Sequence, residues 1–239
     1  MAWKPCLAAI VLSFLSACGG MPTGGPVTTS TPQGGTADSW TRARAEAAVN
    51  QFVSVVQTVE PVAERMCVER TRGLNCDFRI VVDDRIGQPV NAYQSLDSSG
   101  RPVIAFTIGL IADVRNADEL AFVMSHEAAH HIANHIGRQR ANAVAGASVL
   151  GGLASVTGAS AASVEMATRI GASVGARSYS KDFELEADAL GAQIARAAGY
   201  DALNGALYFT RIPDPGDKFL GTHPPNADRL ATVRRAIGG

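Results

Sequence analysis

Aromatic residues are scarce in this chain, and neither sign of charge is in excess. Phe, Trp and Tyr make up 6% of the 239 residues, and the formal net charge is -1. No basic patch or stripe stands out, which argues against a nucleic-acid partner, and the charge balance likewise gives no case for an anionic membrane surface. Hydrophobic residues reach 46%, and there are 24 glycines. A core can therefore form, but mostly from Ala, Val, Leu and Gly.

The apolar stretch at the N-terminus is too short to anchor the chain as a helix across a bilayer. Lys4 precedes it, and it runs from Leu7 to Ser16, which is the layout of a secretory signal peptide. It ends in Leu-Ser-Ala-Cys at Cys18, which resembles the lipobox of bacterial lipoproteins, where the cysteine is lipidated and becomes the first mature residue. The alternative is an ordinary signal peptide with a chance cysteine.

We therefore predict a lipoprotein signal peptide over 1–17, a lipidated Cys18 with a flexible tether over 18–39, and one folded domain over 40–239. The tether is rich in Gly, Pro, Ser and Thr and poor in large apolar residues, a composition typical of flexible linkers. Gly19 follows the cysteine, which by analogy with bacterial sorting favours the outer membrane. The expected location is the cell envelope, with the lipid holding the protein to the membrane on the periplasmic side.

Cysteine is scarce too, and its count fits an oxidising compartment. There are four cysteines, of which Cys6 leaves with the signal peptide and Cys18 takes the lipid. Cys67 and Cys76 remain, an even pair that predicts a disulfide in the periplasm. The alternative is two buried free thiols.

Hydrophobic periodicity predicts an α+β domain that is mainly helical. Pro61 is expected to begin a further helix or to kink the first one, and the proline at the start of the third strand suggests an edge position. The expected helices are 40–59, 116–136 with Asn116 as N-cap and Gly137 as stop, 184–198, 201–208 and 224–236. The expected strands are 78–82, 91–94 and 102–108.

The segment 141–164 carries no charged residue, which raises the question of a membrane span. Most of its residues are Ala, Gly, Ser and Thr, and Glu165 and Arg169 follow at once. We therefore expect a Gly- and Ala-rich helical hairpin over the active site rather than a span.

The pattern His126-Glu127-Ala128-Ala129-His130 predicts a metal site on the helix that contains it. Residues four apart share one face of a helix, so both imidazoles can bind one ion. Glu127 lies beside them, where it can take a proton from a water that attacks a peptide carbonyl. The alternative is an ordinary helix with two histidines. The same rotation makes His131 and His135 face away from the metal, as surface or packing residues.

An acidic run later in the chain offers a third ligand. Glu184 and Asp188 lie one turn apart on one face of a predicted helix, so Glu184 can reach the metal and Asp188 can accept the free ring N–H of a ligating histidine. The alternative is a solvated helix face, and we assign Glu186 to that role.

Four segments together resemble the HtpX and CAAX-prenyl-protease family of zinc metallopeptidases. These are the strands before the active helix (Asn91-Ala92-Tyr93 and 102–110), the active helix from Asp118 to His130, the run Ser180 to Asp188, and Thr222-His223-Pro224-Pro225 with Arg229. The resemblance implies a zincin-like, mainly helical domain with a small β-sheet beside the active-site helix. It also implies one Zn²⁺ per chain, bound by His126, His130 and Glu184, with Glu127 as the base.

The resemblance also gives His223 a place near the metal, where it would stabilise the oxyanion or occupy the open zinc position and keep the enzyme latent. Arg229 is expected to orient the substrate or the His223 loop, and a surface arginine is the alternative. The sequence thus predicts a zinc-dependent endopeptidase for misfolded or misassembled cell-envelope proteins, with polypeptides as substrates. The alternatives are a zinc-stabilised chaperone-like or binding lipoprotein with little turnover, and a structural lipoprotein with an accidental motif.

Overall fold

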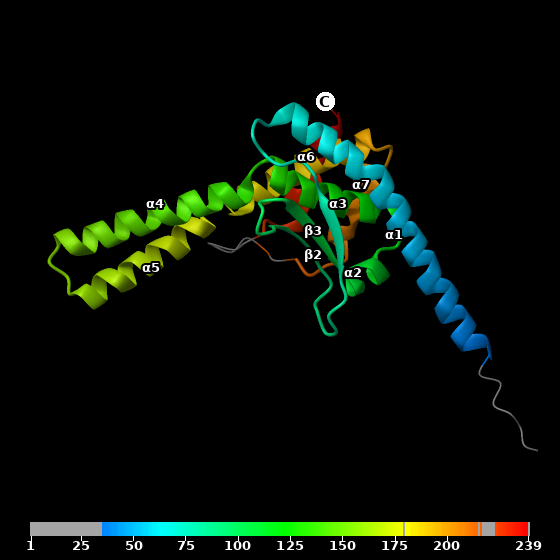
Figure 1. Ribbon diagram of the computed structural model, residues 1–239, viewed down its shortest axis with the longest axis horizontal. Coiled ribbons are helices and arrows are strands. Elements are labelled where there is room, and N and C mark those ends of the chain that lie inside the picture. Colours follow the sequence, from blue (N-terminus) through cyan, green and yellow to red (C-terminus); the bar gives the residue numbers. More distant parts are fainter. Residues whose placement is uncertain (1–34, 179, 215, 217–222, 239) are drawn as a thin grey trace, which may run out of the picture.

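A computed structural model describes residues 35–178, 180–214, 216 and 223–238. The expected signal peptide, Cys18 and most of the expected tether lie outside these residues. The described chain is mainly helical with one small sheet, as the sequence predicts (Figure 1).

The first helix, α1 (Gly35–Arg70), begins five residues ahead of the expected start at Trp40 and runs without a break through Pro61. The expectation that a further helix begins at Pro61 was therefore wrong. The buried face is formed by Val55, Val59 and neighbouring residues, whereas Val49 is 58% exposed. The N-terminal half of α1 extends beyond the body of the protein (Figure 1), which explains why the helical spacing of its apolar residues there does not mark a core.

Three strands form the sheet within the described residues: β1 (Arg79–Asp83), β2 (Ala92–Leu96) and β3 (Pro102–Thr107). Their order is β1-β3-β2, with β1 parallel and β2 antiparallel to β3. The edge position expected for the third strand was wrong, because β3 is central and buried along its whole length. Pro102 is its first residue, and a missing N–H at a strand end does not interrupt the ladder.

The active-site helix α3 (Ala117–Ile132) lies in the middle of the helical layer and follows the short helix α2 (Ile108–Asp113). Its buried face packs on α1, on the sheet and on α6 (Ser180–Ala197), and it carries Leu120, Phe122 and Met124 into the core. The remaining C-terminal elements are α7 (Ala202–Ala206), the 3-10 helix η1 (Leu207–Thr210) and α8 (Asn226–Gly238).

The uncharged segment forms a helical hairpin, as expected, made of α4 (His135–Val156) and α5 (Ala161–Arg177). Figure 1 shows that the hairpin projects away from the body instead of lying over the active site, so the expected placement was wrong. Among the described residues, no helix combines the length and the hydropathy that a membrane crossing requires.

Cys67, in the last turn of α1, and Cys76, before β1, are joined by a disulfide with a Cα–Cα distance of 5.7 Å. This is the pairing that the cysteine count predicts. It fastens the end of α1 to the chain that enters the sheet.

Candidate metal centre

Hydrogen bonds and an ion pair at the first turn of helix α3 fix its position, and with it the position of the residues further along the helix. The Asn116 side chain accepts a hydrogen bond from the Glu119 N–H (2.9 Å), and the Glu119 carboxylate accepts one from the Arg115 N–H (2.8 Å). Glu119, which is buried, also forms an ion pair with the partly buried Arg211 at the end of η1. Asp118 accepts hydrogen bonds from the Asp201 N–H and the Asn204 amide. These contacts tie α3 to the C-terminal segment.

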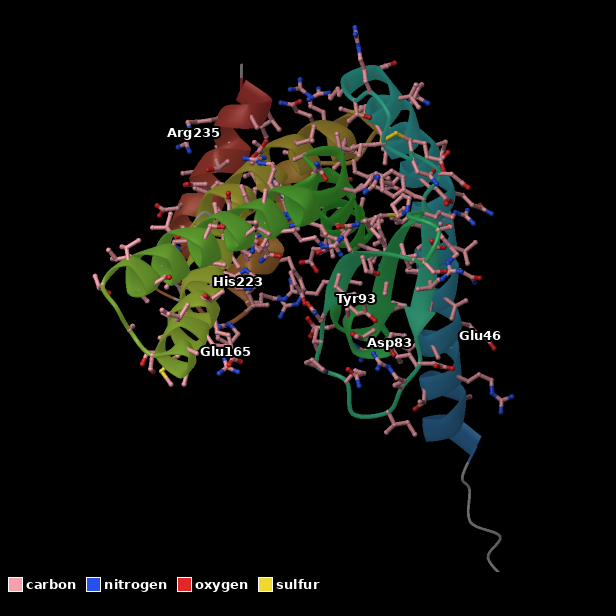
Figure 2. All side chains as sticks on the ribbon, turned by 60° about the vertical axis from the view of Figure 1, so that its left-hand side comes forward. Glu46, Asp83, Tyr93, Glu165, His223 and Arg235 are labelled. Carbon is pink, nitrogen blue, oxygen red and sulfur yellow. A yellow bond between two sulfur atoms is a disulfide. The ribbon has the colours of Figure 1, made fainter. Side chains whose placement is uncertain are left out.

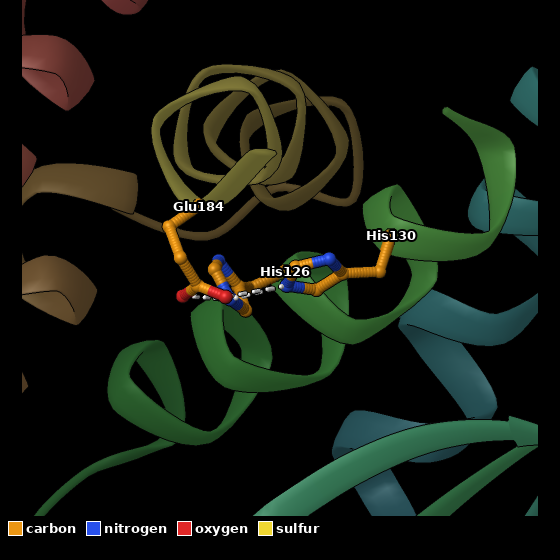
Figure 3. Close-up of side chains that lie close together, drawn as sticks. All are labelled: His126, His130 and Glu184. Carbon is orange, nitrogen blue, oxygen red and sulfur yellow. Dashed lines mark hydrogen bonds and ion pairs between the residues drawn. The ribbon is translucent and has the colours of Figure 1, made fainter. Parts of the chain in front are cut away.

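The three predicted ligands meet at one point (Figure 3). The Nε2 atoms of His126 and His130 are 3.0 Å apart, and the carboxylate oxygens of Glu184 lie 3.5 Å and 3.4 Å from them. All three ligand atoms lie within 4.8 Å of one another. Two imidazoles and a carboxylate are the protein donors of a common type of catalytic zinc site, which leaves a further position for water. The donor set therefore fits zinc.

A glycine allows α6 to approach α3 closely enough for Glu184 to reach both histidines. A Cβ atom on Gly191 would lie 2.9 Å from the backbone N and Cα of His126. Gly191 follows Glu184 by about two helical turns, so both residues lie on the face of α6 that contacts α3. Sequence reasoning missed this residue, although its spacing from Glu184 and Asp188 was a usable signal.

Asp188 lies behind His126, as predicted, and Arg229 lies behind Asp188. The His126 Nδ1–H donates to the Asp188 carboxylate (2.9 Å), which also accepts two hydrogen bonds from Arg229 (2.8 and 2.7 Å). Asp188 is fully buried, and Arg229 is 5% exposed. The guanidinium of Arg229 also lies 3.6 Å from the centre of the Phe209 ring. This arrangement fixes the imidazole ring of His126 with Nε2 toward the ligand cluster, and Arg229 is not a surface residue.

His135 contacts the metal site, contrary to the expectation that it faces away. Its Nδ1 lies 2.8 Å from the Nδ1 of His130, and its Nε2 lies 3.2 Å from the carboxylate of Glu186. The expectation failed because α3 ends at Ile132 instead of continuing to Ile136. Asn134, with φ 53°, turns the chain before α4 begins, so the rotation angle of a continuous helix does not apply to His135.

The contact with His135 also decides which nitrogen of His130 faces the metal. Burial lowers the pKa of His135, so its ring is neutral near pH 7. The Glu186 carboxylate can only accept a proton, so the hydrogen of His135 is on Nε2 and its Nδ1 accepts from His130. That leaves the lone pair of His130 Nε2 for the ion. Glu186, assigned from the sequence to a solvated face, takes part in this chain of contacts and also pairs with Arg138.

His131 has the packing role that the sequence predicts. It is 6% exposed, its Nε2 lies 2.7 Å from the carbonyl oxygen of Asn75, and its ring packs edge-on against Phe78. It therefore fastens α3 to the chain beside the disulfide and takes no part in the ligand cluster.

Burial and hydrogen bonding shift the pKa values of three side chains at the centre. Burial raises the pKa of Glu127 to about 7, against the opposing effect of His126. Burial lowers the pKa of His130 to about 3. Burial also acts to lower the pKa of His126, but hydrogen bonds to Asp188 and Glu184 outweigh it and raise that pKa to about 10. A cation at Nε2 of His126 must therefore displace a proton, so binding releases one.

The ligand cluster lies in a cleft of about 530 Å³ between β2 on one side and α6 with the C-terminal segment on the other. In Figure 2, Tyr93 marks the sheet side of this cleft and His223 the opposite side. The His223 side chain is 54% exposed, and its Nδ1 lies 3.2 Å from the Glu184 carboxylate. Thus His223 reaches the centre from the rim of the cleft.

Comparison with known proteins decides the family. The model of Peptidase family M48 matches residues 51–237, which is most of the chain and includes every residue of the ligand cluster. The chain belongs to peptidase family M48. This protein is therefore a metallopeptidase. The family resemblance seen in the sequence is confirmed.

One relative of this M48 peptidase is a protein of Vibrio cholerae serotype O1 named "Putative beta-barrel assembly-enhancing protease". The two are 31% identical over 147 residues, which is 55% of this chain and 30% of the relative. The chain thus matches less than a third of the relative's length, and the match supports the peptidase assignment.

Proposed function

We propose that this protein is a zinc-dependent endopeptidase that hydrolyses misfolded or misassembled proteins of the cell envelope. The observation that carries the proposal is the convergence of His126, His130 and Glu184 within 4.8 Å, with Glu127 next to them on α3. A zinc ion held by these three side chains would polarise the peptide carbonyl and lower the pKa of a bound water.

Glu127 is positioned and tuned to act as the general base. It follows the first ligand directly, and burial raises its pKa above that of an ordinary glutamate, which favours uptake of a proton. We propose that its carboxylate accepts a proton from the attacking water and then delivers one to the leaving amine. His223, on the rim of the cleft, would donate to the oxygen of the tetrahedral intermediate, which is one of the two roles that the family resemblance implies.

An extended substrate would be bound by β2 and not by β3. β3 cannot accept a further strand, because it already has a strand on each side. β2 pairs only with β3 among the described residues, and Asn91 to Gln94 line the cleft. A peptide added to the free edge of β2 would gain main-chain hydrogen bonds and would lie across the ligand cluster.

We further propose that the protein is a lipoprotein anchored through Cys18 in the outer membrane and facing the periplasm. The lipobox-like residues before Cys18 support this placement, as does the disulfide between Cys67 and Cys76, because disulfides persist in oxidising compartments. Mass spectrometry of the protein from membranes should show a lipid-modified N-terminal Cys18. An unmodified N-terminus at another residue would contradict the anchor.

The Glu127→Gln variant tests the peptidase proposal. Both the wild-type protein and the variant should bind one zinc per chain, measured by elemental analysis, because Glu127 is not a ligand. The wild-type protein should cleave an unfolded protein about 10²–10⁴-fold faster than the variant, the usual contribution of a general base. Equal rates would contradict the proposal. Equal suppression of aggregation by both proteins, without cleavage, would favour the chaperone-like alternative.

A further inference from the structure

The α4–α5 hairpin presents a surface that catalysis at the metal centre does not use. Helix α4 has 22 residues, which corresponds to a length of about 33 Å. The two helices pack closely through glycines: a Cβ on Gly146 would lie 2.1 Å from the carbonyl oxygen of Gly171, and one on Gly151 would lie 2.3 Å from the Thr168 hydroxyl. These contacts fix which positions of the two antiparallel helices lie opposite each other.

Large aliphatic side chains remain exposed along both helices. From the pairing of Gly151 with Thr168, moving two residues in either direction places Val149 level with Ile170 and Leu153 level with Met166. The exposed fractions of these four residues are 66%, 51%, 58% and 59%. Large apolar residues are therefore paired across the hairpin at two successive levels, and more than half of the surface of each one is exposed.

These side chains belong to one face of the hairpin. Successive residues of a helix are rotated by about 100°. On α4, the exposed aliphatic residues lie roughly 105° around the helix from the side that contacts α5. On α5, they lie roughly 125° around the helix from the side that contacts α4, in the same rotational sense. Because the two helices are antiparallel, the same sense of rotation along each chain places both sets of aliphatic residues on one side of the hairpin. Glu165, Arg169 and Val144 lie on the opposite side. We call the apolar side the hairpin face; it consists of Val149, Leu153, Val156, Met166, Ile170 and Val174.

The hairpin face lies on the same side of α4 as the wall of the active-site cleft. His135 and Gln139, in the first turns of α4, line the cleft. Leu153 follows His135 by about five complete helical turns, so both lie on the same side of α4. A polypeptide that leaves the cleft over the base of α4 would therefore meet the hairpin face next. The absence of charge over 141–164 favours a partner that offers apolar side chains rather than charges.

We infer that the hairpin face is a second binding site for the substrate, specific for unfolded polypeptide with exposed apolar side chains. This inference rests on the proposed peptidase function, because the substrate in the cleft is the reason for a polypeptide to lie there. A folded protein buries its apolar side chains and would not occupy the face. Spanning the hairpin of about 33 Å takes roughly ten extended residues beyond the cleft, so short peptides should not use it.

The test compares the Leu153→Lys and Val144→Lys variants. Both positions are exposed on α4, at 58% and 67%, but only Leu153 lies on the hairpin face. The substrates are a six-residue peptide, which fills only the cleft, and reduced carboxymethylated lactalbumin, which is permanently unfolded. For Leu153→Lys, KM for the unfolded protein should rise at least about fivefold, with kcat and the hexapeptide kinetics unchanged. Val144→Lys should behave as wild type with both substrates.

Binding without cleavage separates this inference from the peptidase proposal. In the Glu127→Gln background, fluorescence anisotropy of labelled carboxymethylated lactalbumin should show weaker binding for Leu153→Lys and unchanged binding for Val144→Lys. Equal effects of the two lysines, or an equal loss on the short and long substrates, would overturn the inference. So would a Leu153→Lys effect seen only in self-association during sedimentation or only in binding to phosphatidylcholine vesicles, since the face would then bind a second copy or a bilayer.

Discussion

Replacing Gly191 by alanine should push apart the two helices that form the metal centre. The added methyl group would lie 2.9 Å from the backbone N and Cα of His126 and 3.2 Å from the carbonyl carbon of Ser125. Backbone atoms cannot rotate away as a side chain can. To reach an ordinary contact of about 3.4 Å, α6 must move by about 0.5 Å, which equals the tolerance of a preorganised site.

Two effects of the substitution oppose each other. Alanine in place of glycine in a helix interior stabilises by about 0.5–1 kcal/mol. Overpacking of a tight contact costs about 1–3 kcal/mol. The net change for Gly191→Ala should therefore be a loss of about 1 kcal/mol in the free energy of unfolding, the difference between the midpoints of these ranges. Because Glu184 moves with α6, the zinc affinity should fall about tenfold as well.

Gly152→Ala is the matched control. Gly152 lies inside α4, and a Cβ atom there would meet nothing within 4 Å, so only the helix-propensity gain remains. Urea unfolding of the metal-free proteins should show a higher midpoint for Gly152→Ala and a lower one for Gly191→Ala, with unchanged slopes. Zinc affinity, measured by competition with a chelator, should fall only for Gly191→Ala. If Gly191→Ala matched the control in both measurements, the close approach of α6 and α3 would not limit the site.

Three further predictions concern the surroundings of the centre. Asp188→Asn removes the closer of the two carboxylates beside the buried Arg229 and leaves only Glu184, at 3.6 Å, so we expect a loss of about 3 kcal/mol in the free energy of unfolding. The same change should weaken zinc binding about 10–100-fold; unchanged urea unfolding and zinc affinity would contradict it. Glu186→Ala should weaken zinc binding about tenfold, because the His135 ring loses the carboxylate that holds it. Glu186→Gln should bind zinc more tightly than Glu186→Ala. Equal zinc affinities of the two variants in chelator competition would refute the role of Glu186. Reduction of the disulfide, which closes a loop with a sequence separation of 9, should lower the free energy of unfolding by about 2–3 kcal/mol, and an unchanged urea midpoint would exclude that contribution.

The residues that act through local geometry could be predicted from the sequence. His126 and His130 share a face because they are four residues apart on one helix, and Glu184 and Asp188 do so for the same reason. The cap at Asn116 and the three strands follow from local patterns as well. Where a continuous helix was assumed beyond its real end, the prediction for His135 failed, because Asn134 takes a left-handed conformation that no periodicity revealed.

The sequence by itself determined which side chains can bind a metal ion and which carboxylate can act as base, since spacing on a single helix decides what lies on one face. The tertiary structure alone decided how the two helices approach each other, that His135 and Glu186 lie behind His130, and where the hairpin points. Contacts such as Gly191 against His126, or Arg229 against Asp188, join residues far apart in the chain. They depend on packing between elements. The spacing of Gly191 from Glu184 and Asp188 indicates a shared helix face, but no local pattern records which helix that face meets.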